Sequence, residues 1–303
     1  METYKKKESL VQNITFMALM AAINVIFVVL TTLVPFLLFL IVFVLPLTSV
    51  LVVLHCKKIY FPIYAIATIG LCMICTIWKI DDTVFYVIPS IVSGFVFGLF
   101  IEKKIPSFWI IIVTTIIQIG FTYASIPLIK LITGRDIVND FATVFGIVEF
   151  QYLSYVVACF IFFISLAQEI IAYIIVKEEI PKFGYQLNEP KSLPLSLFIS
   201  LLITITLAFA LMFVYGPISY LFTLFGLLLA IFAFIYLILE NKKLVYILLA
   251  AGFVLSIFLF ALLYQTVSEP LGLIFINIFF FIEAIIVLVN NYLFKPHNID
   301  TIK

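Results

Sequence analysis

Two acidic residues lie inside long apolar stretches of the sequence, where charged groups are rare, costly and often functional. Glu169 follows Gln168 in the stretch 150–176, and Glu283 lies in the stretch 271–294. At 1.5 Å per helical residue, Glu283 lies about 18 Å and Glu169 about 12 Å from the lysine that ends each stretch. Each carboxyl is either a neutral acid that hydrogen-bonds to a neighbouring helix or a group that couples protons or contacts a substrate.

A second group of charged, amide and aromatic side chains lies around two loops between apolar stretches. Three cations occur there beside acids and tyrosines, which favours a vestibule for a small polar or anionic solute. Ordinary solvated loop ends are the alternative interpretation. The candidate solute-binding residues are Lys79, Asp82, Tyr86, Arg135, Glu149 and Gln151.

Catalytic and metal-binding patterns are missing from the sequence. His55 has no His, Asp or Glu partner at helical spacing, and H-E-x-x-H, G-x-S-x-G and Walker-type motifs do not occur. The pair Cys72 and Cys75 supplies fewer ligands than zinc requires and lies in an unbroken apolar run. We therefore expect no catalytic residues, no metal site, no cofactor and no ATP hydrolysis by this chain.

The composition shows which solvent surrounds these residues. Hydrophobic residues make up 65% of the 303 residues and charged residues 11%, and the mean hydropathy is +1.31. A soluble domain is roughly 45–50% apolar and about 25% charged. The surface must therefore face lipid. A net charge of +1 without a basic stripe argues against a nucleic-acid partner.

Apolar runs of bilayer length predict an all-α integral membrane protein, a polytopic bundle of about ten transmembrane helices (8–10). A helix needs about 20 apolar residues to cross the hydrocarbon core. Only Val34 and Pro35 separate the first two runs, so these form the least certain pair of full spans. The runs are 13–33, 35–55, 59–79, 83–101, 105–130, 150–176, 194–215, 218–239, 244–264 and 271–294.

The distribution of lysines predicts the orientation. If the N-terminus is cytoplasmic and the spans alternate, three of the 17 cations lie outside and the other fourteen inside, as the positive-inside rule requires. The outer three are Lys79, Lys130 and Arg135. This pattern predicts ten spans, two cytoplasmic termini, and a multi-pass protein of a bacterial-type cell (plasma) membrane.

Prolines and charges divide the chain into two parts. The polar stretch after Lys177 contains Pro181, Pro190 and Pro194, which is typical of a linker. We therefore expect a six-helix membrane domain at 1–180, a cytoplasmic linker at 181–193 and a four-helix membrane domain at 194–303.

Small residues four apart mark two helix faces for close packing. They are Ala18 with Ala22 in the first span, and Gly94 with Gly98 in the fourth. Such residues let two helix backbones approach each other. The partner is usually another helix of the same chain, but an exposed face can also receive a second subunit.

The first 180 residues resemble the substrate-binding S subunits of energy-coupling factor (ECF) vitamin importers. The segments that carry the resemblance are Ile14-Thr-Phe-Met-Ala-Leu-Met-Ala-Ala22 and Ile88-Pro-Ser-Ile-Val-Ser-Gly-Phe-Val-Phe-Gly98. Those subunits have six helices and an outward-opening solute pocket. The resemblance implies that Ala18 and Ala22 contact a transmembrane coupling subunit, which works with cytoplasmic ATPases.

Over its whole length the chain is similar to the YybS-like bacterial multi-spanning membrane proteins. The stretch Asn277-Ile-Phe-Phe-Phe-Ile-Glu-Ala-Ile-Ile-Val resembles the last helix of that family. That family has a glutamine–glycine pair where this chain has Glu283-Ala284. This difference puts a shared role for Glu283 in doubt.

Three functional hypotheses follow. The leading one is a transport protein of the S-subunit type, which captures a small water-soluble nutrient outside and depends on a separate energising complex. The second is a non-transporting scaffold in membrane or envelope organisation, which the four additional C-terminal spans favour. The third is a proton-coupled secondary carrier that uses Glu169 or Glu283.

Overall fold

The computed structural model describes residues 9–34, 37–148, 152–185, 187–188, 195–239 and 243–264, together with 282, 284–286 and 289. Within this part every regular element is helical and no strand occurs. Seven of its helices are long and apolar enough to cross a bilayer. The chain is therefore an all-α, multi-pass membrane bundle.

Helices lie at nine of the ten predicted runs, and the tenth run, 271–294, lies almost entirely outside the described residues. Val34 ends the first helix in an extended conformation, so the first two runs form separate helices. A short helix, α7 (Ile137–Val144), lies between two of the long ones. The long helices are α1 (Leu10–Leu33), α2 (Leu38–His55), α3 (Phe61–Cys75), α5 (Ile88–Glu102), α6 (Ser107–Thr133), α8 (Leu153–Glu179), α9 (Leu195–Met212), α10 (Gly216–Leu239) and α11 (Lys243–Tyr264).

The apolar helical segment Ile77–Glu102 has an irregular first part and continues as α5. A 3-10 turn at Ile77–Lys79 and the short α4 (Ile80–Asp82) lead into a π-helical turn at Thr83–Val87. The N–H of Ile88 donates to the carbonyl of Thr83, five residues earlier. Pro89 has no N–H to donate, which loosens the regular ladder at this point. Such π-turns often occur at functional sites.

The chain forms two compact units, which we describe separately. The first contains residues 1–150 and 160–189, and the second contains 151–159 and 190–303. The start of α8 thus groups with the second unit, whereas the sequence places it in a domain at 1–180. Its Tyr155 ring lies 5.9 Å from the ring of Tyr220, which explains this grouping.

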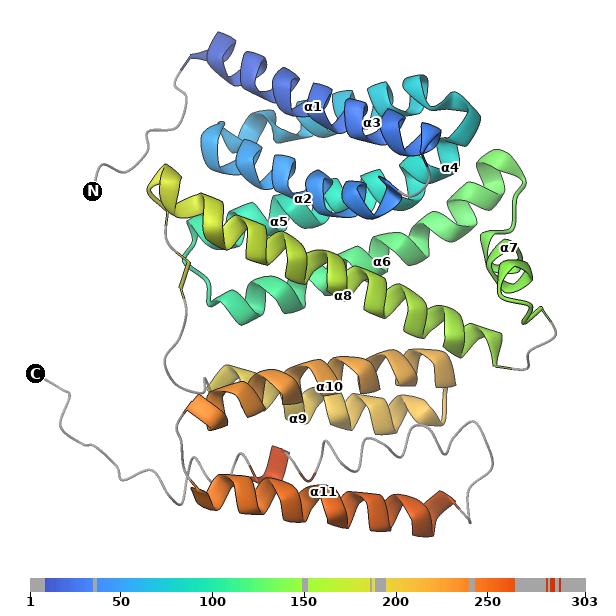
Figure 1. The fold of residues 1–303 in the computed structure, drawn as a ribbon, viewed down its shortest axis with the longest axis vertical. Coiled ribbons are helices and arrows are strands. Elements are labelled where there is room, and N and C mark those ends of the chain that lie inside the picture. Colours follow the sequence, from blue (N-terminus) through green and yellow to red (C-terminus); the bar gives the residue numbers. More distant parts are fainter. Residues whose placement is uncertain are drawn as a thin grey trace, which may run out of the picture. The chain divides into compact units, whose positions relative to one another are not determined.

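In the first unit, α2 and α5 pack side by side without room for side chains at two glycines (Figure 1). A Cβ atom at Gly94 would lie 2.5 Å from the carbonyl oxygen of Pro46, and one at Gly98 would lie 2.7 Å from Cβ of Val53. A real Cβ atom essentially never lies this close to an atom to which it is not bonded. The two glycines therefore let the backbones of α2 and α5 approach closely.

A buried polar network joins α1, α2 and α3. The amide of Asn24 donates to the hydroxyl of Tyr64 at 2.9 Å, and Thr48 donates to the Asn24 side-chain oxygen at 2.8 Å. All three residues are buried. Because lipid offers no hydrogen bonds, these side chains satisfy one another and fix the contact among the three helices.

The first half of the predicted linker is bound to the first unit. The hydroxyl of Tyr185 donates to the carbonyl of Leu54 at 2.9 Å, and the amide of Asn188 donates to the carbonyl of Lys104 at 2.8 Å. The backbone N–H of Ser107 donates in turn to the carbonyl of Asn188 at 2.9 Å. The rest of the predicted linker, 189–193, lies outside the described residues.

In the second unit, α9 and α10 form a helical pair. One face of α9 is buried through Leu197, Leu201, Ile205, Ala208 and Met212. At the start of α10, Ser219 donates a hydrogen bond of 2.5 Å to the carbonyl of Ala208. The Tyr155 hydroxyl lies 1.8 Å from where a Cβ at Gly216 would be, so a side chain at this position would have to displace the tyrosine.

Replacing Gly94 by alanine tests the α2–α5 contact. The new methyl group must push α2 and α5 apart, and overpacking of this kind costs about 1–3 kcal/mol. We expect Gly94→Ala to lower the melting temperature of the purified protein in detergent. Gly120→Ala is the matched control, because nothing lies within 4 Å of the new Cβ. Equal melting temperatures for the two variants would contradict the packing.

Candidate functional site in the first unit

Polar residues on three helices meet in the interior of the first unit. On α6 they are Thr114, Gln118 and Thr122, each four residues after the last, so they share one face. On α8 they are Ser165, Gln168 and Glu169, and on α5 they are Ser90 and Ser93. All eight are buried, although the sequence around them is apolar.

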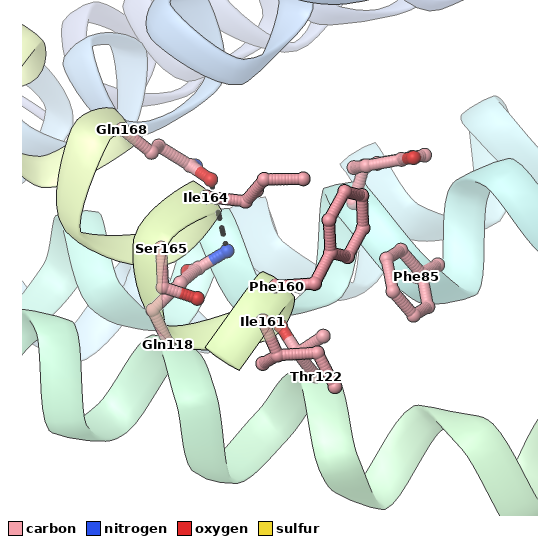
Figure 2. Close-up of a pocket in the computed structure, with 9 residues that line it drawn as sticks. Phe85, Gln118, Thr122, Phe160, Ile161, Ile164, Ser165 and Gln168 are labelled. Atoms are coloured by element: carbon pink, nitrogen blue, oxygen red, sulfur yellow. Dashed lines mark hydrogen bonds between the residues drawn. The ribbon is translucent and has the colours of Figure 1, made fainter. Parts of the chain in front are cut away.

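A chain of hydrogen bonds connects the three helices. The Gln118 amide donates to the Gln168 side-chain oxygen at 3.1 Å, as Figure 2 shows, and the Gln168 amide donates to the Ser90 hydroxyl at 2.7 Å. Ser90 donates to the carbonyl of Tyr86 at 2.6 Å. The side-chain oxygen of Gln118 is buried and has no partner within the described part of the chain. A buried acceptor left in this state carries a desolvation cost of about 1–3 kcal/mol.

A small cavity lies against this chain of hydrogen bonds, with about 10 Å³ open to the centre of a water molecule. Gln118, Thr122, Ser165 and Gln168 form its polar wall, and Phe85, Tyr86 and Phe160 are its aromatic lining residues (Figure 2). Phe85 and Tyr86 both belong to the π-helical turn. A cavity needs roughly 10–15 Å³ of such space to hold one water molecule, so this cavity holds about one water and is much smaller than an open ligand pocket.

Ion pairs form at the same end of the unit as Tyr86. Arg135 donates to Asp81 and, at 2.8 Å, to Asp140, while Lys130 donates to Asp136 at 2.8 Å. We call these five residues the ionic cluster. The two loops that the sequence identifies thus come together, and Arg135 and Lys130 are both already paired with carboxylates.

The pKa values in the ionic cluster follow from these pairs. The hydrogen bond to Asp140 and the charge of Asp81 raise the pKa of Arg135. The hydrogen bonds from Lys130 and from the backbone N–H of Asn139 lower the pKa of Asp136. Asp136 is also the N-cap of α7, where its side chain accepts the Asn139 N–H at 3.2 Å.

The predicted solute-binding residues divide into three sets. Lys79, Asp82 and Arg135 lie close enough for their charges to interact, and the Lys79 ammonium lies 3.5 Å from the carbonyl of Thr32. Tyr86 lines the cavity. Glu149 and Gln151, like Glu283, lie outside the described residues.

The other singled-out residues have clear positions. Glu169 is fully buried near the cavity, next to Gln168. Ala18 and Ala22 lie on an exposed face of α1. Cys72 is buried and Cys75 half-buried, and both are free thiols. No three His, Cys, Asp or Glu residues gather as metal ligands within the described ranges.

The cavity residues Gln118, Thr122 and Ser165 were not selected as site residues from the sequence, and neither was Ser90, which accepts a hydrogen bond from Gln168. The repeat of Thr114, Gln118 and Thr122 at intervals of four in an apolar run is the signal that identifies this face. No protein-family model, no curated protein and no solved structure matches this chain. The arrangement of its own residues therefore carries the functional inference.

The order of α7 should depend on the ionisation of Asp136. Because its folded-state pKa is lowered, its contribution to stability is present above the unfolded-state value of about 3.9. That contribution is lost as the pH falls through the folded-state pKa. We expect hydrogen exchange of the α7 amides, corrected for intrinsic rates, to accelerate across that acid range.

Two variants of Asp136 distinguish the effect of its charge from the effect of its capping hydrogen bond. Asp136→Asn retains a capping side chain without the charge and should make α7 exchange almost independent of pH. Asp136→Ala removes the cap as well and should expose α7 even at neutral pH. Identical exchange in all three proteins would show that Asp136 does not stabilise α7.

Proposed function

We propose that this protein is a membrane transport protein of the S-subunit type, which captures a small water-soluble nutrient at the outer face of a bacterial-type cell membrane. The cavity among α5, α6 and α8 carries this proposal. One of its lining residues is Gln118, whose side-chain oxygen is a buried acceptor without a partner in the described part. A solute that donates an N–H or O–H to this oxygen would remove the desolvation cost.

The contacts favour a neutral solute over an anionic one. Arg135 and Lys130 are paired with Asp81, Asp140 and Asp136, so an anion would have to displace a carboxylate. The cavity itself offers amides, hydroxyls and aromatic rings rather than charges. With about 10 Å³ open to the centre of a water molecule, the cavity must widen for any solute larger than water, so capture requires the π-helical turn to move aside as the solute enters.

The proposal includes an orientation and ten spans with both termini in the cytoplasm. In the first unit, Lys58 pairs with Glu102 at 2.9 Å, next to Lys103 and Lys104 at the end of α5. The ionic cluster lies at the opposite end of α6, around the last turn that holds Lys130. The positive-inside rule places the lysine-rich end in the cytoplasm and the ionic cluster outside.

Energy for transport would come from other subunits, because the sequence has no nucleotide-binding motif. Ala18 and Ala22 lie exposed on α1, as a docking face for a coupling subunit requires. The proposed kinship with ECF S subunits and YybS-like proteins agrees with this arrangement. The partners would be that coupling subunit, cytoplasmic ATPases and the lipid bilayer.

Thermal unfolding of the purified protein tests solute capture. A panel of small neutral vitamins and nucleobases should include at least one compound that raises the melting temperature in a concentration-dependent way, as mass action requires. Gln118→Leu should abolish this shift because it removes the acceptor.

Ser125→Ala is the matched control, since Ser125 lies on the same helix and donates to the carbonyl of Thr122 at 2.7 Å instead of lining the cavity. This variant should retain the shift. A panel without any stabilising compound, or a shift that survives in Gln118→Leu, would contradict capture in this cavity. The first of these results would favour a scaffold without a solute.

A further inference from the structure

The Glu169 carboxyl is the most unusual group in the first unit. The residue has no exposed surface, and neither carboxyl oxygen has a hydrogen-bond partner within the described residues. The polar neighbours of this carboxyl are the hydroxyls of Ser93 from α5 and Thr114 from α6. No charged side chain of the described part interacts with it. An ionised carboxylate without a donor or counter-charge is very costly in such surroundings.

The two neighbouring hydroxyls give their hydrogens elsewhere. Thr114 donates to the carbonyl of Ile110 at 2.7 Å, and Ser93 donates to the carbonyl of Ser90 at 3.3 Å. Each hydroxyl therefore offers lone pairs, not a hydrogen, to Glu169. A proton on the carboxyl would supply the donor for these lone pairs that the ionised form lacks.

Glu169 belongs to a layer of side chains that lies further from the ionic cluster than the cavity wall does, on each of the three helices. Ser90, Gln118 and Gln168 form the layer at the cavity, and Ser93, Thr114 and Glu169 form the next layer. The directions of the helices agree with this order of layers, because α5 and α8 run away from the ionic cluster and α6 runs towards it. Figure 2 shows Gln118 and Gln168, two of the residues that line the cavity, joined by their hydrogen bond.

Beyond Glu169 the buried residues of α8 are apolar. Phe97, Ile110, Ala172 and Val176 are fully buried and belong to one hydrophobic cluster that continues towards the lysine-rich end. The side chains that join the cavity to the layer of Glu169 are thus polar, whereas the buried residues of this cluster are apolar.

From this geometry we propose that Glu169 is a proton-exchange site at the base of the cavity. The carboxyl carries a proton, donates it in a hydrogen bond to the hydroxyl of Ser93 or Thr114, and exchanges it with water that enters through the layer of Ser90, Gln118 and Gln168. The inference does not depend on the capture of a solute. Proton relays in membrane proteins use intramembrane carboxyls of this kind.

Infrared difference spectroscopy of the lipid-reconstituted protein tests the site directly. At pH 7 exposed carboxyls are ionised, so the carbonyl stretch of a protonated carboxylic acid should appear in wild type and vanish in the isosteric variant Glu169→Gln. Transfer into D₂O should shift the band as the proton is replaced by a deuteron. Thr114→Val should also shift it, by removing a hydrogen-bond acceptor.

Thr115→Val is the matched control, because Thr115 is the adjacent buried threonine and does not act on Glu169. It should leave the band unchanged. Identical spectra for wild type and Glu169→Gln would overturn the proposal, and so would a band that D₂O does not shift. Loss of the band on addition of NaCl would replace it with a sodium site. Equal melting temperatures of wild type and Glu169→Gln would verify that the variant is folded.

Discussion

A polar group inside a bilayer has no water to bind, and this constraint determines the interior of the protein. Helix formation satisfies the N–H and C=O groups of the backbone. A buried polar side chain must instead find its partner within the bundle, for example on a neighbouring helix. In the first unit two sets of side chains meet this requirement differently. Asn24, Thr48 and Tyr64 satisfy one another across α1, α2 and α3. The set on α5, α6 and α8 leaves acceptors open at Gln118 and Glu169.

This difference distinguishes side chains that hold the helices together from side chains that can accept a hydrogen bond from a ligand. A closed network gains nothing from a ligand, because each added hydrogen bond would replace one already made. An open acceptor beside a cavity gains a full hydrogen bond when a donor arrives. The π-helical turn belongs to the open set, since it brings Phe85 and Tyr86 to the cavity and holds the carbonyl that accepts from Ser90. The glycine contacts of α5 with α2 hold this helix in place.

Local properties of the sequence predict much of the fold. Bilayer-length apolar runs give the positions of the helices, and the spacing of Gly94 and Gly98 indicates close packing, because both depend on residues near one another in the chain. The pairing of Arg135 with Asp81 and the meeting of Gln118 with Gln168 depend on residues about 50 apart, so no local pattern contains them. For the same reason the predicted linker gave no indication that Tyr185 and Asn188 bind the first unit.

The central claim is that lipid covers the outside of the helices while water reaches the polar interior of the first unit. Single cysteines in a variant that lacks the four native ones test it with a small water-soluble thiol reagent. Ser165→Cys and Thr122→Cys, at positions 2% and 5% exposed, should react. Phe163→Cys and Ile116→Cys, at positions 49% and 47% exposed, should not react, because lipid shields them. Reaction at 163 and 116 with none at 165 and 122 would contradict the account.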